Sequence, residues 1–465
     1  MLDLDDLEQR IERAMQRCDV PGLALCIVKG REVRYARGFG VVGVEDHTAP
    51  VTPQTVFRIG SMTKPLTVVA IMRLVEAGAL DLDRPITAYL PELRLRTPGA
   101  AEHITLRMLL SHSAGLPERS LMRQGRRDPE GLELEMREDL PRYPLVAAPG
   151  SLWSYSTLGF NLAGYVAQVA AATPFAELMQ SLVFEPLEMR RATFDPTVAA
   201  TYPLAQLVGE AADGSLYVYH DGGDNTANYP GAYAFATALD LANFAIMSMH
   251  GGDFKGTQLL SAASLAQIHA PRANLYVDTG LSYGLGMYVE PPYKGLRRIG
   301  HEGTLPGAAG KLVMAPDAQL AVVALYNREN LGGPFYPLCD GIIDSIFDQM
   351  LALPAEDAPR ASAEPEHSAW TQYAGDYSRA FAMSRVTVAV ENERLVLRND
   401  RERVALEPRS NGLYVGRLPG GAQPGLWPRA PYRASPNLSV GFLSSARQPT
   451  PYLSINTNVH KRIAS

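Results

Sequence analysis

The chain has 465 residues, of which 46% are hydrophobic and 20% are charged, and its formal net charge is -6. These values are ordinary for a globular protein and exclude a collagenous, low-complexity or largely disordered chain. The mild acidity argues against nucleic acid as a partner, because nucleic-acid-binding proteins carry basic surfaces. Three cysteines without Cys-x-x-Cys spacing exclude a disulfide framework and a cysteine metal site, so we expect buried thiols in a reducing compartment.

The first residues of the sequence do not predict an export signal. Residues 1–6, MLDLDD, are acidic, and no apolar signal-peptide core follows them. No apolar run reaches the length that spans a bilayer, and Arg73 interrupts the best candidate, residues 65–75. We therefore expect a cytoplasmic protein with no membrane partner.

The first elements in chain order are a helix, a hairpin and a second helix. The spacing of apolar residues predicts a helix over 4–17. A buried strand over 22–29 and its hairpin partner over 32–42 come next. Residues 62–77 are then predicted to be helical, ending at Gly78.

The middle of the chain, from about residue 85 to 280, carries helical patterns such as those over 161–171 and 175–187. After it come four predicted strands and a helix, over 284–290, 296–302, 310–315, 319–326 and 335–351. Strands at both ends of a helical stretch predict an α+β fold, in which an antiparallel sheet is flanked by helices and interrupted by a helical insertion.

The clearest linker lies at 354–368, which is rich in Pro, Ala and Glu and has no apolar period. Beyond it, apolar and polar residues alternate in short runs, with a long loop over 412–435. That pattern predicts a small all-β barrel or sandwich. We therefore divide the chain into a domain over 1–353, a linker over 354–369 and a β-domain over 370–465.

The first candidate site is Ser61-Met62-Thr63-Lys64 at the start of a predicted helix. Residues three apart share a helix face, so the hydroxyl of Ser61 and the amine of Lys64 can meet. Serine becomes a nucleophile when a base takes its proton, and lysine can be that base if burial lowers its pKa. The chain has only six lysines, which makes this one conspicuous, although a capping serine followed by a solvated lysine is the simpler interpretation of the motif alone.

Two further segments carry candidate residues. Tyr155 lies in the Ser/Thr-rich turn 153–157 and could bring a phenol to a proton relay, unless it is merely a packed aromatic residue. In Gly300-His301-Glu302-Gly303-Thr304, the alternation along a strand places His301 and Gly303 on one side. Glycine allows a substrate to approach the backbone, and the amide of Thr304 can then donate to an oxyanion.

Together the three segments resemble the penicillin-recognising serine hydrolases, specifically the class C β-lactamase-like group of esterases and D-aminopeptidases. The order and spacing of Ser-x-x-Lys near 60, tyrosine near 155 and His-x-Gly near 300 agree with this group. The passages 109–117, 149–150 and 283–286 match it too, so that the resemblance covers roughly residues 1–350. It implies a β-lactamase/transpeptidase-like fold and no cofactor, and the scattered histidines indicate no metal site.

The resemblance also implies roles for single residues. Ser61 would be the acylated nucleophile, with Lys64 and Tyr155 as its proton relay. The backbone N–H groups of Ser61 and Thr304 would form the oxyanion hole. His301 stands where the group has lysine, histidine or tryptophan.

Two departures from the group concern substrate binding. Thr157 replaces the usual asparagine of Tyr-x-Asn, and a hydroxyl cannot reproduce the paired donor and acceptor of a carboxamide. Asn161 could substitute for it, but a helix-surface position is the simpler interpretation. His301 replaces the lysine of true β-lactamases and, being mostly neutral, is a poorer anchor for a carboxylate. We therefore expect Thr157 and Gly303 to line the substrate site, and we do not expect a dedicated β-lactamase.

The sequence thus predicts a serine hydrolase that acts through a Ser61 acyl-enzyme on small ester or amide and short-peptide substrates. His-x-Gly and the C-terminal β-domain resemble the D-aminopeptidases, whereas Thr157 favours an esterase. A non-catalytic binding protein of the same fold, or an acyltransferase with an acceptor other than water, are the alternatives. His112 and Asp240 could be triad partners, but loop capping and a helix start explain them more simply. The sequence does not predict the oligomeric state.

Overall fold

The computed structural model describes residues 2–45, 49–118, 127–211, 213–220, 224–276, 280–328, 335–354, 370–378, 385–392, 394–399, 402–408, 413–417, 437–445, 448–455 and 458–462. Its largest sheet is antiparallel and has the strand order β2-β1-β14-β13-β12-β11-β10-β9. Strands from both ends of the first 326 residues are therefore hydrogen-bonded neighbours, with β1 paired to β14, as the sequence predicts. The bounds are β1 (Gly22–Lys29), β2 (Glu32–Gly40), β9 (Ala273–Asn274), β10 (Ser282–Tyr283), β11 (Tyr288–Val289), β12 (Ile299–Leu305), β13 (Ala308–Ala315) and β14 (Leu320–Tyr326).

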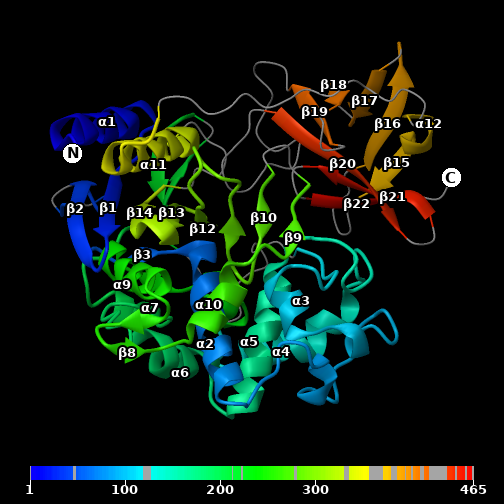
Figure 1. The fold of residues 1–465 in the computed structure, drawn as a ribbon, viewed down its shortest axis with the longest axis horizontal. Helices are drawn as coiled ribbons and strands as arrows, with labels where there is room; N and C mark the ends of the chain where they lie inside the picture. Colours follow the sequence, from blue (N-terminus) through cyan, green and yellow to red (C-terminus); the bar gives the residue numbers. More distant parts are fainter. Residues whose placement is uncertain are drawn as a thin grey trace.

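Two helices cover one face of this sheet. The helices α1 (Leu4–Arg17) and α11 (Phe335–Leu351) lie side by side over β1, β13 and β14 (Figure 1). Leu7 and Ile11 of α1 pack with Ile343 of α11 and with Val322 of the sheet in one buried cluster. The N-terminal helix and the last helix before the linker thus close the same side of the core.

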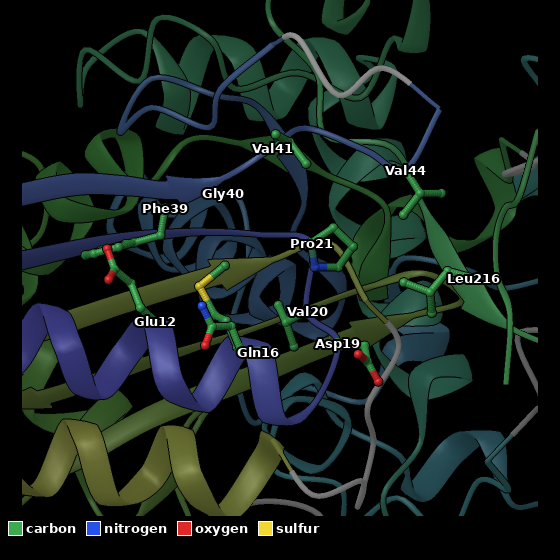
Figure 2. A pocket seen from close by; sticks show the side chains of 11 residues that line it. Glu12, Gln16, Asp19, Val20, Pro21, Phe39, Gly40, Val41, Val44 and Leu216 are labelled. Carbon is green, nitrogen blue, oxygen red and sulfur yellow. The ribbon is translucent and has the colours of Figure 1, made fainter.

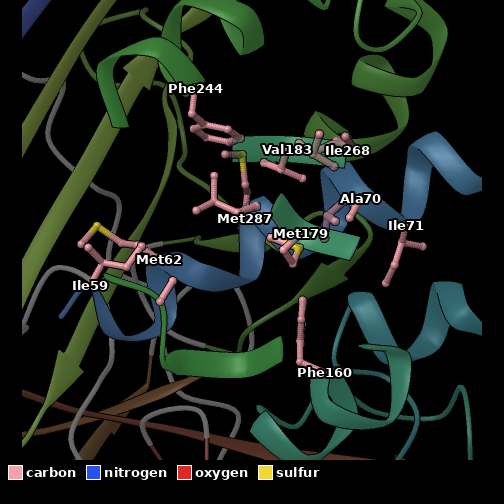
Figure 3. Packing of buried hydrophobic residues seen from close by; sticks show 14 of the residues in the cluster. Ile59, Met62, Ala70, Ile71, Phe160, Met179, Val183, Phe244, Ile268 and Met287 are labelled. Carbon is pink, nitrogen blue, oxygen red and sulfur yellow. The ribbon is translucent and has the colours of Figure 1, made fainter. Parts of the chain in front are cut away.

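The opposite face is covered by the predicted helical insertion and by α2 (Thr63–Glu76). Every residue of α2 from Thr63 to Met72 is buried, so this helix is surrounded by other elements (Figure 3). Helices that are buried on all sides lack a polar face. Lys64 is the one charged side chain in this buried stretch, and it therefore needs partners inside the protein.

The remaining elements are mostly short. The helices are α3 (Leu106–Leu110), α4 (Gly131–Leu134), α5 (Thr157–Ala171), α6 (Phe175–Met179), α7 (Pro196–Ala199), α8 (Tyr229–Ala232), α9 (Ala238–Met249), α10 (Ala262–His269) and α12 (Trp370–Tyr373). Three two-stranded pairs join β3 (Phe57–Arg58) to β6 (Phe235–Ala236), β4 (Val208–Glu210) to β5 (Leu216–Val218), and β7 (Asp253–Phe254) to β8 (Thr257–Gln258).

The C-terminal strands form a closed barrel, one of the two architectures predicted for this part. Its strands are β15 (Gly375–Ser378), β16 (Arg385–Glu391), β17 (Arg394–Arg398), β18 (Arg403–Pro408), β19 (Tyr414–Arg417), β20 (Asn437–Ser445), β21 (Gln448–Ile455) and β22 (Asn458–Arg462). The barrel closes because β15 pairs with both β16 and β22. It has an apolar core of its own, which includes Tyr377, Leu397 and Val440.

Several predicted bounds differ from those observed. The helix predicted over 161–171 begins earlier, at Thr157, because the Ser156 hydroxyl caps it by accepting the Gly159 N–H. The helix predicted over 175–187 continues after α6 as a wider π-type turn over Gln180–Phe184. The strand predicted over 284–290 is confined to β11, since a turn occupies its first residues.

The predicted linker over 354–368 lies outside the described residues except for its first residue, and the predicted loop over 412–435 does so except for 413–417. The three cysteines, Cys18, Cys26 and Cys339, are buried and unpaired. Within the part of the chain that is described, no helix combines the length and apolar character needed to cross a membrane.

A cavity of about 590 Å³ opens between α1, β2 and β5 (Figure 2). Its walls are largely apolar, with Val20, Phe39 and Leu216 among them, and Glu12 and Asp19 also line it. None of the site residues predicted from the sequence contributes to this cavity.

Candidate active site

Ser61 lies in the 3₁₀ turn over Gly60–Met62, directly before α2. Its side chain is partly exposed, whereas the residues that follow it are buried. The hydroxyl therefore stands at the N-terminal end of a buried helix. The helix dipole favours developing negative charge at that end.

Lys64 is fully buried one turn later, and its Nζ contacts Ser61 Oγ at 2.9 Å. The same nitrogen donates to the Gly231 carbonyl oxygen at 2.8 Å and to Thr157 Oγ1 at 3.3 Å. Burial lowers the pKa of Lys64 to about 7, and the nearby carboxylate of Glu118 opposes that shift. A neutral amine at this position can accept a proton from Ser61.

Tyr155 completes the contact from the other side, because its hydroxyl donates to Ser61 Oγ at 2.9 Å. Loss of water around the ring raises the pKa of the Tyr155 phenol well above 10, so the phenol stays protonated at neutral pH. His112 holds this segment: its Nδ1 accepts the Ser156 N–H at 3.0 Å, and its ring lies 4.3 Å from the Tyr155 ring between centroids. The structure thus brings Ser61, Lys64 and Tyr155 together.

Thr157, the first residue of α5, makes its contacts inside the protein. Its backbone N–H donates to Glu118 Oε2 at 2.5 Å, and its hydroxyl donates to Glu118 Oε1 at 3.1 Å. The Thr157 oxygen also accepts from Lys64. A role of Thr157 in binding substrate stays a prediction, since the observed contacts tie its hydroxyl to the lysine.

The turn that carries Ser61 approaches β12 closely, and glycines on both sides permit it. A Cβ on Gly303 would stand 1.8 Å from the Ile59 carbonyl oxygen and 3.1 Å from the Ser61 amide nitrogen. Gly60 has a φ of +55°, and a Cβ there would stand 2.5 Å from the Thr304 amide nitrogen. The amides of Ser61 and Thr304 therefore lie on neighbouring backbone segments, as an oxyanion hole requires.

His301 is buried in β12 and uses both ring nitrogens within the protein. Nδ1 lies 2.5 Å from the Glu302 carbonyl oxygen, which can only accept, so Nδ1 carries the proton. Nε2 then accepts from the Tyr283 hydroxyl at 2.8 Å. Burial lowers the pKa of His301 to about 3. A direct catalytic role for His301 stays a prediction, and the geometry favours a neutral side chain that positions β12.

The interpretation of Asn161 as a helix-surface residue is wrong. Asn161 is buried, and its amide donates to Asn228 Oδ1 at 2.6 Å and to Glu135 Oε2 at 3.1 Å. Asp240 is the third residue of a capping box with Thr237, in agreement with the helix-start interpretation. Neither residue reaches Ser61 through any contact described here.

Sequence reasoning missed two residues of this site. Glu118 directly follows the 109–117 passage, and Tyr283 opens the 283–286 passage, yet neither received a role. Glu118 could have been found from the sequence, because this carboxylate directly follows a passage that matches the class C β-lactamase-like group. As for metals, the described residues contain no group of three or more His, Cys, Asp or Glu side chains arranged to hold an ion.

Comparison with known proteins shows the family to which this fold belongs. The family model described as "Beta-lactamase" matches residues 7–336, and the chain belongs to that family. Among curated proteins, the esterase EstB of Burkholderia gladioli is 34% identical over 200 residues. That match covers 40% of this chain and 50% of EstB, so the chain spans about half the length of this relative.

Two solved structures share the fold at low identity. The crystal structure of SurE with D-Leu has a TM-score of 0.74 at 22% identity, and the match covers 99% of both chains, the barrel included. The D-amino acid amidase of Ochrobactrum anthropi SV3, complexed with L-phenylalanine amide, has a TM-score of 0.63 at 20% identity, covering 75% of this chain and all of that one.

Proposed function

We propose that this chain is a serine hydrolase in which Ser61 forms an acyl-enzyme with small ester or amide substrates. The observation that carries this proposal is the meeting of Lys64 Nζ and the Tyr155 hydroxyl at Ser61 Oγ, each at 2.9 Å. Tyr155 lies far from Ser61 and Lys64 in the sequence, and a non-catalytic protein of the same fold has no need to keep all three in contact.

The proposed reaction begins with neutral Lys64. As Ser61 Oγ bonds to the substrate carbonyl carbon, its proton passes to Lys64 Nζ. The carbonyl oxygen becomes an oxyanion that the amides of Ser61 and Thr304 stabilise, which is usually the largest single contribution to such catalysis. The bond to the leaving group then breaks, and that group receives a proton from Lys64 by way of the Tyr155 hydroxyl. Water repeats the sequence and releases the acid.

The pKa values support this division of work. With its pKa lowered to about 7, Lys64 is substantially neutral at physiological pH and can act as the base. Tyr155 retains its proton, so it serves as a hydrogen-bond donor and a proton carrier. No metal or cofactor is part of this scheme.

The substrate could be an ester or an amide. Two observations favour esters. Thr157 stands in place of the asparagine carboxamide that would bind a substrate amide, and its hydroxyl is already bound to Lys64 and Glu118. In addition, the relative EstB is an esterase. The full-length likeness to SurE, whose structure contains D-Leu, and the amidase with L-phenylalanine amide favour amino-acid amides or peptides. We propose esters first and D-amino-acid amides second.

The test compares p-nitrophenyl esters with D- and L-amino acid anilides on wild-type protein and Ser61→Ala. Removing one member of a cooperating catalytic unit costs roughly 10³-fold or more in kcat. Ser181→Ala, an exposed serine on the π-type turn after α6, is the matched control and should keep full turnover. Equal turnover by wild type and a folded Ser61→Ala on every substrate would overturn the proposal.

A further inference from the structure

Glu118 makes two hydrogen bonds to Thr157, and the proposed mechanism gives neither of them a role. The carboxylate accepts the backbone N–H and the hydroxyl of Thr157 through different oxygens. Both partners are donors, and Thr157 is the first residue of a 15-residue helix, whose N-terminus favours negative charge. The carboxylate therefore receives two hydrogen bonds at the positive end of a helix dipole.

The direction of these hydrogen bonds determines what is left for Lys64. Because the Thr157 proton points to Glu118, the Thr157 oxygen must accept from Lys64. The Gly231 carbonyl oxygen can only accept, so it takes a second N–H. A neutral amine has two N–H groups and one lone pair. The lone pair of Lys64 is therefore left facing Ser61 Oγ.

Glu118 also acts on Lys64 through its negative charge, which favours the protonated amine. The nearby side chains of Tyr155, His112 and His301 are uncharged at neutral pH. Burial raises the pKa of Tyr155 and lowers the pKa of His112 and of His301. Glu302 lies on β12, and its charge acts on Tyr155.

We propose that Glu118 is a positioning residue for Lys64 that acts through Thr157. It orients the Thr157 hydroxyl so that the lysine lone pair faces Ser61, and it supplies the negative charge that offsets the burial of the amine. This inference rests on the proposed function, in which neutral Lys64 takes the Ser61 proton. It also explains Thr157, since a threonine can relay this contact with one oxygen.

Replacing the charge should shift a pH profile in a defined direction. Glu118→Gln removes the negative charge that favours protonated Lys64, so the pKa of Lys64 falls. Because the neutral lysine is the active form, the acidic limb of kcat/KM should move to lower pH, by about one pH unit. The plateau should fall as well, since a carboxamide no longer forces the Thr157 proton away from Lys64. A purely structural role would lower the plateau without moving the limb.

The experiment measures p-nitrophenyl ester hydrolysis between pH 4 and 10 for wild type and Glu118→Gln. Glu177→Gln, an exposed glutamate on α6, is the matched control and should leave the limb in place. Glu118→Asp keeps the charge on a shorter side chain, so its limb should stay near the wild-type position. This second variant keeps the test decisive if Glu118→Gln fails to fold, because a limb moved to lower pH by Glu118→Asp would contradict the inference.

A second measurement separates this inference from the proposed function. The chain has six lysines, so ¹³Cε-lysine NMR can follow Lys64 directly, with Lys64→Arg to assign its signal. The Lys64 titration should move to lower pH in Glu118→Gln. An unchanged titration overturns the role of Glu118 even if Ser61 is active. If the wild-type protein hydrolyses none of the substrates, but the Lys64 titration still moves to lower pH in Glu118→Gln, then the proposed function alone is overturned.

Discussion

Lys64 places an amine in a stretch of α2 where every residue from Thr63 to Met72 is buried. Water cannot stabilise the charged form there, and the partners of the amine are a serine, a threonine and a carbonyl oxygen, none of which is an anion. Desolvation of this kind favours the neutral amine. The residue that the helix can least accommodate as a charge is thus the one that the mechanism needs as a base.

A pH profile follows directly. Because the base is neutral Lys64 with a pKa of about 7, kcat/KM for an ester should rise through about pH 7 and level off above it. Tyr155 remains protonated well beyond pH 10, so no descending limb is expected below that pH once spontaneous hydrolysis is subtracted. A flat profile between pH 5 and 9 would contradict the assignment of Lys64 as the base.

Thr157 and His301 also bear on substrate choice. The Thr157 hydroxyl contacts Lys64 and Glu118, and both nitrogens of neutral His301 are used by Tyr283 and Glu302. Neither residue offers a free amide or a cation to a β-lactam. Nitrocefin should therefore be turned over with a kcat/KM at least roughly 100-fold below that of the best simple ester, a loss of about 3 kcal/mol. Comparable values for the two substrates would show that other groups bind the β-lactam.

At the scale of elements, the site depends on the close contact of the Ser61 turn with β12. Gly303→Ala would place a methyl group 1.8 Å from the Ile59 carbonyl oxygen, so the two segments must separate. Overpacking of this kind typically costs about 1–3 kcal/mol, and the separation should also spoil the oxyanion hole. Thermal unfolding should show a lower Tm, and the ester kcat should fall by at least roughly tenfold.

Gly341→Ala is the matched control for that variant. Gly341 lies in α11, and a Cβ there meets nothing within 4 Å. Alanine is favoured over glycine inside a helix by up to about 1 kcal/mol, so Tm should stay the same or rise, and kcat should not change. If Gly303→Ala behaves like Gly341→Ala, the close approach does not matter for catalysis.

Most elements of the larger sheet follow from the sequence because their signals are local. The apolar period predicts the observed bounds of α1 and α11, and β1 is a continuous apolar run. The start of α5 was missed because it depends on the Ser156 cap, and β9 to β11 are too short to show a period. For the C-terminal part, the sequence predicted either a barrel or a sandwich. It could not distinguish the two, because closure of the barrel depends on the pairing of β15 with β22.

The candidate site also contains residues that local sequence predicts and residues that depend on distant contacts. Ser61 and Lys64 are three residues apart, so one helical turn is enough to predict their contact. Tyr155 was a candidate because of its Ser/Thr-rich turn, and the family resemblance gave it a role in the proton relay. Glu118 was not found, because its contact with Thr157 joins residues 39 apart in the sequence. Asn161 was misjudged because its burial depends on Glu135 and Asn228, which no local pattern connects to it.

At the scale of the whole molecule, the barrel touches the segment that leads to Tyr155. Leu443 on β20 packs in one buried cluster with Ala147 and Leu152, and Tyr452 on β21 and Tyr276 pack against the cluster. Figure 1 shows the barrel beside β9 and β10, at the edge of the large sheet. The described hydrogen bonds of Ser61, Lys64 and Tyr155 all come from residues before the barrel. We therefore propose that the barrel restricts access without supplying chemistry.

Leu443→Ala tests this role. Loss of the leucine should loosen the contact and change the ratio of kcat/KM for bulky and small acyl esters by several-fold, while a small fluorophosphonate still labels Ser61. Val390→Ala, at a residue of β16 that is 41% exposed, is the control within the barrel. An unchanged ratio would leave the barrel with a stabilising role only. Loss of labelling in a folded Leu443→Ala would mean that the barrel helps to position Tyr155.

Whether Ser61 is a nucleophile activated by Lys64 is tested most directly by intact-mass spectrometry of the protein after reaction with a fluorophosphonate probe near pH 8. We expect a single adduct, which peptide mapping places on Ser61 and which is absent from Ser61→Ala. Lys64→Arg should react much more slowly, because arginine does not deprotonate and cannot accept the serine proton. An adduct on folded Ser61→Ala, equal labelling of Lys64→Arg, or no adduct on the folded wild-type protein would show that Ser61 and Lys64 are not the nucleophile and its base.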